Sequence, residues 1–100
     1  MKLADIAQVI RSKNAGPRRL TLDVMFASDA AYQRVAQSPA LAPEHIAALY
    51  RVPARDVTVI PYPVGPAVKI VLARAIMAGD PGDFDVYGAQ QHAPLLGVEI

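Results

Sequence analysis

Three segments of the chain alternate apolar and polar residues with the two-residue period of a β-strand. Two of them are residues 57–62 and 67–74, and Pro61 places the end of the former at a sheet edge or bulge because proline has no N–H to donate. The third, residues 20–27, is the clearest strand. Its apolar positions are Leu20, Leu22, Val24 and Phe26. Asp23, between them, is expected to point away from the core or into a polar site.

Two short helices are expected between the second and third strands. Ser28 is a good N-cap for a helix over residues 29–37, which ends before Pro39. Pro43 suits the first turn of a second helix that runs to about residue 50. The residues expected to point inward from this second helix are Ile46, Leu49 and Tyr50.

The first 18 residues are harder to assign. Residues 3–10 fit either one face of a helix or a short strand, and their β-branched side chains favour a strand at about residues 5–11. Residues 11–18 predict a loop, because Asn14 and Gly16 tolerate a left-handed backbone and Pro17 cannot donate to a ladder.

The order of these elements predicts the fold class. Strands joined by short connections are usually antiparallel, and the helices must cover one face of the sheet. We therefore expect an α+β fold of ferredoxin-like type, with an antiparallel sheet of about four strands and two helices on one face. With 100 residues, the chain is expected to form a single domain over residues 1–100.

The composition bears on location and partners. Hydrophobic residues make up 53% of so short a chain, so some apolar surface is expected to meet another subunit in a homo- or hetero-oligomer. A net charge of +1 predicts no affinity for nucleic acid or membrane. The chain has no cysteine, no signal-peptide pattern and no apolar run near the roughly 18 residues of a membrane span. These features predict a cytoplasmic protein.

Charges are unevenly distributed along the chain. The basic residues Arg11, Lys13, Arg18 and Arg19 lie close together, and the last fifth of the chain holds Asp80, Asp83, Asp85 and Glu99. These are either solvated loops or two oppositely charged ends that meet in the fold.

Residues 11–16 form the first candidate site. A guanidinium, a hydroxyl, an ammonium and an amide next to a flexible backbone could hold a carboxylate or phosphate, although the order differs from a phosphate-binding loop. The expected anion-binding residues are Arg11, Ser12, Lys13, Asn14 and Gly16. The alternative is a solvated structural loop.

Residues 82–96 form the second candidate site and are the densest in groups that bind or move protons. The candidate acid or base residues are His92, Asp85 and Tyr87, and the residues expected to shape the site are Asp83, Gly88, Gln90 and Gln91. No serine or cysteine lies nearby to act as a nucleophile. The two aspartates and the histidine are too few for a convincing metal site, so we predict none, and the segment specifies no cofactor. His92 also fits a structural or interface role.

Together, the segments 9–17, 20–23 and 82–96 resemble a bacterial family catalogued as a domain of unknown function, number four-three-eight-seven. The resemblance covers nearly the whole chain. It implies association with larger proteins of the acyclic-terpene-utilisation type, which often end in a small ferredoxin-like domain with an Arg-Ser-Gly-Asp-Lys-Gly loop. Residues 11–16 are similar to that loop but lack its Gly-Asp pair. This similarity favours a strand at residues 5–11.

These observations lead to three hypotheses. The first is an accessory subunit that docks on such a larger protein and helps bind an anionic metabolite, a carboxylate or an acyl-CoA. The second is a free-standing lyase or hydratase with His92 or Asp85 as base. The third is a purely structural homo-oligomer. Whether the chain is an enzyme stays open, and in each case the segment 82–96 is half of a site or interface whose other half is the basic segment 11–16.

Overall fold

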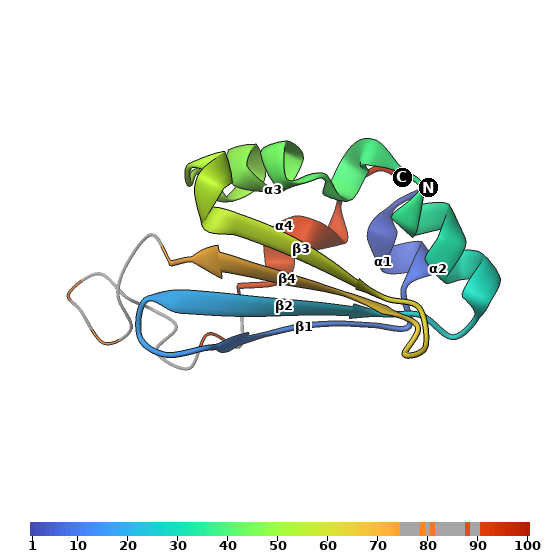
Figure 1. The fold of residues 1–100 in the computed structure, drawn as a ribbon, viewed down its shortest axis with the longest axis horizontal. Helices are drawn as coiled ribbons and strands as arrows, with labels where there is room; N and C mark the ends of the chain where they lie inside the picture. Colours follow the sequence, from blue (N-terminus) through green and yellow to red (C-terminus); the bar gives the residue numbers. More distant parts are fainter. Residues whose placement is uncertain (75–78, 80, 82–87, 89–90) are drawn as a thin grey trace.

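The computed structural model describes residues 1–74, 79, 81, 88 and 91–100 (Figure 1). Its centre is a four-stranded antiparallel sheet with the order β1-β2-β4-β3. The strands are β1 (Val9–Asn14), β2 (Arg19–Met25), β3 (Val57–Tyr62) and β4 (Ala67–Ala73). Each half of the sheet is a hairpin, and β2 pairs with β4 to join the halves. The first and third strands are therefore the two edges.

The helices lie on one side of the sheet (Figure 1). They are α1 (Leu3–Ile6), α2 (Asp29–Ala36), α3 (Pro43–Tyr50) and α4 (Ala93–Leu96), with two 3-10 turns, η1 (Pro39–Leu41) and η2 (Ala54–Asp56). The longer helices α2 and α3 are the two that the sequence predicts. The predicted α+β class and four-stranded antiparallel sheet are confirmed, and the ferredoxin-like description is compatible with this arrangement.

Local sequence explains where α2 and α3 begin and end. The hydroxyl of Ser28 accepts a hydrogen bond from the N–H of Ala31 and caps the first turn of α2. Pro43 occupies the first turn of α3, where its missing N–H costs nothing. Arg51 ends α3 in the left-handed conformation, with φ of 59°.

The prediction for the first 18 residues was wrong in two respects. Residues 3–6 form a helical turn, and the first strand spans Val9–Asn14 rather than residues 5–11. Residues 11–14 are consequently not a loop, because each pairs with a residue of β2, from Arg11 with Asp23 to Asn14 with Leu20. The connection to β2 contains only residues 15–18.

The core fills the space between the sheet and the helices. Leu22, Ile46 and Ile70 are fully buried, as the strand and helix patterns predict. Leu3 and Leu95 are also 0% exposed. Leu3 comes from a helix that the sequence offered only as the alternative to a strand, and Leu95 from a short helix that was not predicted. On α3 the expectation for Leu49 was wrong, since it is 39% exposed, while Ala47 is buried.

The opposite side of the sheet is covered by no helix or strand among the described residues, and we call it the open face. Its side chains alternate with the core residues along each strand. They are Val9, Arg11, Lys13, Arg19, Thr21, Asp23, Met25, Thr58, Ile60, Tyr62, Ala67, Lys69, Val71 and Ala73.

The two ends of the chain meet in a short antiparallel pair, which we call the terminal ribbon (residues 1–3 and 98–100). Lys2 lies opposite Glu99 in an isolated bridge, and the N–H of Leu3 donates to the carbonyl of Val98 at 2.8 Å. The amino group of Met1 lies 3.1 Å from Oε2 of Glu99. The ribbon lies on the helix side of the sheet, beside η1 (Figure 1).

Candidate functional site

The predicted anion-binding segment is divided between the two faces of the sheet. Because β1 is a strand, successive side chains alternate, and Arg11 and Lys13 lie on the open face. Ser12 and Asn14 point to the helix side, where Ser12 is buried and Asn14 partly so. Gly16, with φ of 89°, lies in the turn that follows. These five residues are adjacent in sequence but do not converge on one ligand.

Ser12 connects the first candidate segment to the second. Its hydroxyl donates to the carbonyl oxygen of Gly88 and accepts a hydrogen bond from the N–H of Gln91 at 3.0 Å. We call this pair of hydrogen bonds the Ser12 latch. Since it occupies the hydroxyl as both donor and acceptor and is buried, we assign Ser12 a structural role.

Gly88 passes so close to β1 that it must be glycine. Its φ is 73°, and a Cβ there would lie 2.5 Å from Oδ1 of Asn14 and 2.9 Å from the backbone nitrogen of the same residue. Asn14 Oδ1 in turn accepts a hydrogen bond from Nη1 of Arg74 at 2.7 Å. Gly88 is thus fitted against the end of β1, and we call the described residues 88 and 91–96 the tail.

Tyr50 holds the tail from the helix layer. Its hydroxyl donates to the carbonyl oxygen of Gln91 at 2.7 Å, so Gln91 is bound through its N–H by β1 and through its carbonyl by α3. Burial raises the pKa of the Tyr50 phenol well above its ordinary value, because the charged phenolate loses hydration. Tyr50 therefore stays neutral and donates throughout the physiological pH range.

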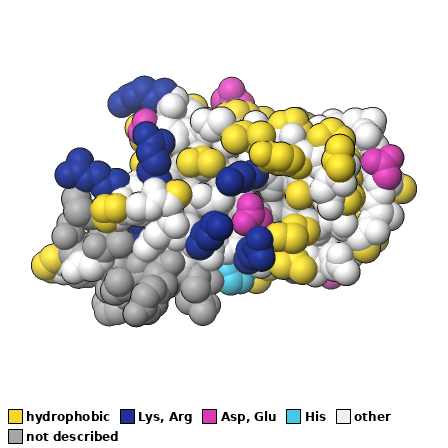
Figure 2. All heavy atoms as spheres, turned by 60° about the horizontal axis from the view of Figure 1, so that its bottom comes forward, with side chains coloured by type: hydrophobic (Ala, Val, Ile, Leu, Met, Phe, Trp, Pro, Cys, Tyr) yellow, Lys and Arg dark blue, Asp and Glu magenta, His cyan; other side chains and the backbone are white. Residues whose placement is uncertain are grey.

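The open face carries most of the charge near the predicted site. Nε of Arg11 lies 3.3 Å from Oδ2 of Asp23, and Lys69 lies opposite Asp23 on the neighbouring strand. Lys13 and Arg19 lie on the same face without a carboxylate opposite. In Figure 2, Lys and Arg side chains are spread over this side of the molecule, with hydrophobic side chains beside them.

Lys69 and Arg19 are cations that were not among the predicted anion-binding residues. Lys69 lies between the core positions Val68 and Ile70, and Arg19 directly precedes the core position Leu20. The alternation therefore places both side chains opposite the core. What the sequence lacked was the strand order, which places them beside the residues of β1.

The tail supplies one described acid or base candidate. His92 precedes α4, and its Nδ1 is buried without a hydrogen-bond partner among the described residues. Asp83, Asp85, Tyr87 and Gln90 lie outside the described residues, so their predicted roles stay predictions. Glu99 approaches the N-terminus rather than the basic residues of β1, so the expected meeting of charged ends does not involve it.

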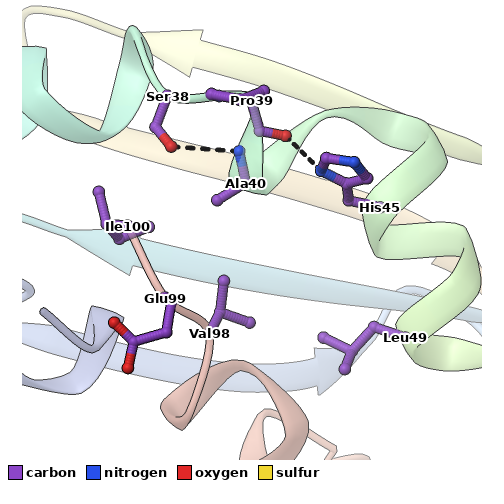
Figure 3. Close-up of a pocket in the computed structure, with 8 residues that line it drawn as sticks. All are labelled: Ser38, Pro39, Ala40, His45, Leu49, Val98, Glu99 and Ile100. Carbon is purple, nitrogen blue, oxygen red and sulfur yellow. Dashed lines mark hydrogen bonds between the residues drawn. The ribbon is translucent and has the colours of Figure 1, made fainter.

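Two hollows lie on the helix side. The larger, about 520 Å³, is a groove between α3 with η1 and the terminal ribbon (Figure 3). The smaller, about 280 Å³, lies between α2, η1 and the edge strand β3. Neither is lined by the cations of the open face or by the Ser12 latch.

A family model described as "Domain of unknown function (DUF4387)" matches residues 3–99. The chain belongs to this family. The match confirms the resemblance drawn from the segments 9–17, 20–23 and 82–96. It includes the whole sheet, the Ser12 latch and the open face of this DUF4387 domain. No curated protein and no solved structure matches the chain.

Within the described residues, no three His, Cys, Asp or Glu side chains lie close enough together to hold a metal ion. In the same part of the chain, none of the helices has the length and apolar character needed to cross a membrane.

Proposed function

We propose that this DUF4387 domain is a cytoplasmic accessory subunit. It docks on a larger protein of the acyclic-terpene-utilisation type and contributes the cationic wall of a site for an anionic metabolite, a carboxylate or an acyl-CoA. One observation carries the proposal. Among the described residues of its strands, the open face presents four cations, Arg11, Lys13, Arg19 and Lys69, and one carboxylate, Asp23.

The chemistry of the open face fits a ligand that is anionic at one end and apolar at the other. Lys13 and Arg19 lie in successive rows of the sheet as diagonal neighbours, roughly 7–8 Å apart, so their long side chains can share one phosphate or carboxylate. Arg11 and Lys69 lie on either side of Asp23 in the row beyond Lys13. The next row is apolar, with Val9, Met25, Ala67 and Tyr62 side by side. A thioester of coenzyme A combines phosphates with an acyl chain and matches both rows.

The shape of the open face supports an accessory role. Arg11, Lys13 and Arg19 are exposed, so on the described surface an anion bound by them would stay in contact with water. Ion pairs in water contribute little, whereas the same pairs strengthen when another surface excludes solvent. A partner that covers the face would therefore complete the site, and the sequence resemblance indicates which class of partner this is.

The test is to co-express the full chain with a larger protein of the acyclic-terpene-utilisation type, purify the complex and titrate it with acetyl-coenzyme A in a calorimeter. We expect co-purification and a saturable binding event. In the variant Lys13→Glu/Arg19→Glu, binding should weaken by at least about a hundredfold, because two charge-assisted contacts of roughly 1.5–3 kcal/mol each are lost.

The matched control is Arg34→Glu/Arg55→Glu, which makes the same change in net charge at exposed positions of α2 and η2 on the helix side. This variant should bind as the unmodified complex does. A domain that never associates with the larger protein, or equal binding by both double variants, would rule the proposal out.

A further inference from the structure

The terminal ribbon has one edge that carries an unused pair of backbone groups. The hydrogen bonds on either side of the Lys2–Glu99 pair run from Leu3 N–H to Val98 and from Ile100 N–H to Met1. In an antiparallel ladder this pattern makes Lys2 and Glu99 a non-hydrogen-bonded pair, whose N–H and C=O groups point outward. Among the described residues, the N–H and C=O of Glu99 make no hydrogen bond.

That edge borders the larger groove. Val98, Glu99 and Ile100 line one side of the groove, and η1 and α3 line the other. The Glu99 side chain is turned away from His45 and Leu49, so Glu99 borders the groove with its backbone (Figure 3). A hydrogen-bond donor and an acceptor thus lie side by side at the margin of an apolar hollow.

The opposite wall is apolar and fixed in place. Pro39, Ala40 and Leu49 contribute apolar surface, and Leu49 is 39% exposed although it lies on a helix that packs on the core. His45 ties η1 to α3, because its Nδ1 lies 2.6 Å from the carbonyl oxygen of Pro39 and must donate to it. With about 520 Å³, the groove is within the range of roughly 300–1,000 Å³ typical of ligand sites.

We propose that this groove binds an extended apolar peptide segment of a partner protein, which adds to the terminal ribbon as a third strand. One residue of the segment would pair with Glu99, donating its N–H to the Glu99 carbonyl and accepting the Glu99 N–H. This mode of recognition takes affinity from main-chain hydrogen bonds and specificity from alternate side chains. It is independent of the anion site, since the groove lies on the helix side and the cations on the open face.

The register of the added strand defines the side chains it needs. Val98 and Ile100 pack against the core, so Glu99 faces the other way. The residue that pairs with Glu99 shares its outward direction, and a basic side chain there is favoured by the Glu99 carboxylate. The residues on either side point toward the groove and should be apolar. The preferred segment is therefore apolar–basic–apolar.

The experiment is a titration of the full-length, nitrogen-15-labelled chain with acetyl-glycyl-valyl-lysyl-leucyl-glycinamide, followed by amide chemical shifts. We expect shifts at Glu99, Ala40 and Leu49, and hydrogen exchange of the Glu99 amide slowed about tenfold at saturation. The matched probe is the same peptide with a methyl group on the backbone nitrogen of its lysyl residue. It keeps every side chain, but this residue can no longer donate a backbone hydrogen bond to Glu99. It should bind about tenfold more weakly, because it loses a hydrogen bond at a strand edge.

Variants test the apolar wall in the same assay. Leu49→Gln should weaken binding of the unmodified peptide about tenfold, whereas Val64→Gln, at a position 97% exposed and outside the groove, should leave it unchanged. Equal binding of the two peptides would show side-chain insertion without strand pairing and overturn the proposal. Absence of binding would also overturn it, as would concentration-dependent shifts at Glu99 without peptide, which would mean that a second copy fills the groove.

Discussion

Successive side chains of β1 lie in two different environments. Ser12 is 8% exposed and its hydroxyl has both a donor and an acceptor partner, in the tail. Arg11, its neighbour, has a side chain that is 59% exposed and a single ion pair to Asp23. Residues 11–14 are consecutive in sequence but therefore have two roles. The inward side chains bind the tail, and the outward side chains carry the charge.

The difference indicates what each side of the strand contributes. A buried, fully bonded hydroxyl contributes to stability, and its loss leaves the partners without hydrogen bonds. An exposed ion pair contributes little to stability, but its charges are available to a ligand or partner. We therefore expect substitutions on the inward side to affect folding and those on the outward side to affect binding.

The largest expected effect is at Gly88, where the tail touches β1. Gly88→Ala should lower the free energy of unfolding by about 3 kcal/mol. An alanine in the left-handed backbone conformation is strained, and its Cβ would displace Asn14. Gly16→Ala is the matched control, because its φ is 89° and nothing lies within 4 Å of the added Cβ. It should cost only about 1 kcal/mol in urea denaturation. Equal losses would show that the tail does not press on β1.

Removal of the Ser12 hydroxyl should come next. Ser12→Ala leaves a buried carbonyl and a part-buried N–H without their partner, and we expect a loss of about 2 kcal/mol in urea denaturation. Hydrogen exchange of the Gln91 amide should become faster. Ser38→Ala removes a comparable hydroxyl that accepts only the N–H of Ala40, and should cost less than about 1 kcal/mol. A Ser12→Ala protein with unchanged Gln91 exchange would argue against the latch.

Tyr50 tests the second attachment of Gln91. Tyr50→Phe should cost about 1 kcal/mol at neutral pH, because the hydrogen bond to Gln91 is lost. Because the folded state raises the phenol pKa from its ordinary 10.0, the unfolded chain ionises first and stability should fall as pH rises above about 10. The Phe variant should lack this part of the alkaline decline when unfolding is measured from pH 8 to 11. Identical slopes for the two proteins would contradict the assignment.

The smallest effect on stability is expected on the open face. Arg11→Ala should change the free energy of unfolding by less than about 1 kcal/mol, because the ion pair with Asp23 is largely exposed on the arginine side. The same variant should weaken anion binding by the partner complex about tenfold, as measured by calorimetry. If instead folding suffers more than binding, the division between the two sides of β1 is wrong.

The sequence was sufficient for the central elements. β3 spans Val57–Tyr62 as predicted, and β2 and β4 lie within one residue of their predicted bounds at most ends. Each of these strands has apolar residues at every inward position, and burial of that set fixes the strand and its register. Ser28 and Pro43 likewise mark the starts of α2 and α3 through local backbone chemistry.

Only the first part of β1 was predicted as strand, because two of its three inward residues, Ser12 and Asn14, are polar and only Ile10 is apolar. Ser12 and Asn14 are satisfied by Gly88, Gln91 and Arg74, whose positions 60 or more residues away no local pattern reveals. The same limit applies to the site. The polar content of the segments 11–16 and 82–96 was sufficient to infer that they adjoin. It did not show that residues 11–14 are divided between the two faces of the sheet, because that division follows from the strand. The roles of Asp83, Asp85, Tyr87 and Gln90 stay predictions.

The terminal ribbon has a consequence for how the protein is made. Met1 and Glu99 are 98 residues apart in sequence, so their contact forms long after Met1 has been synthesised. A growing chain can close both hairpins and the helices between them while the ribbon still lacks its second strand and Ser12 lacks its partners. Completion of the fold must therefore wait until residues 88–100 have left the ribosome, and slow emergence of these residues should prolong the time for which the edge of β1 can pair with other chains.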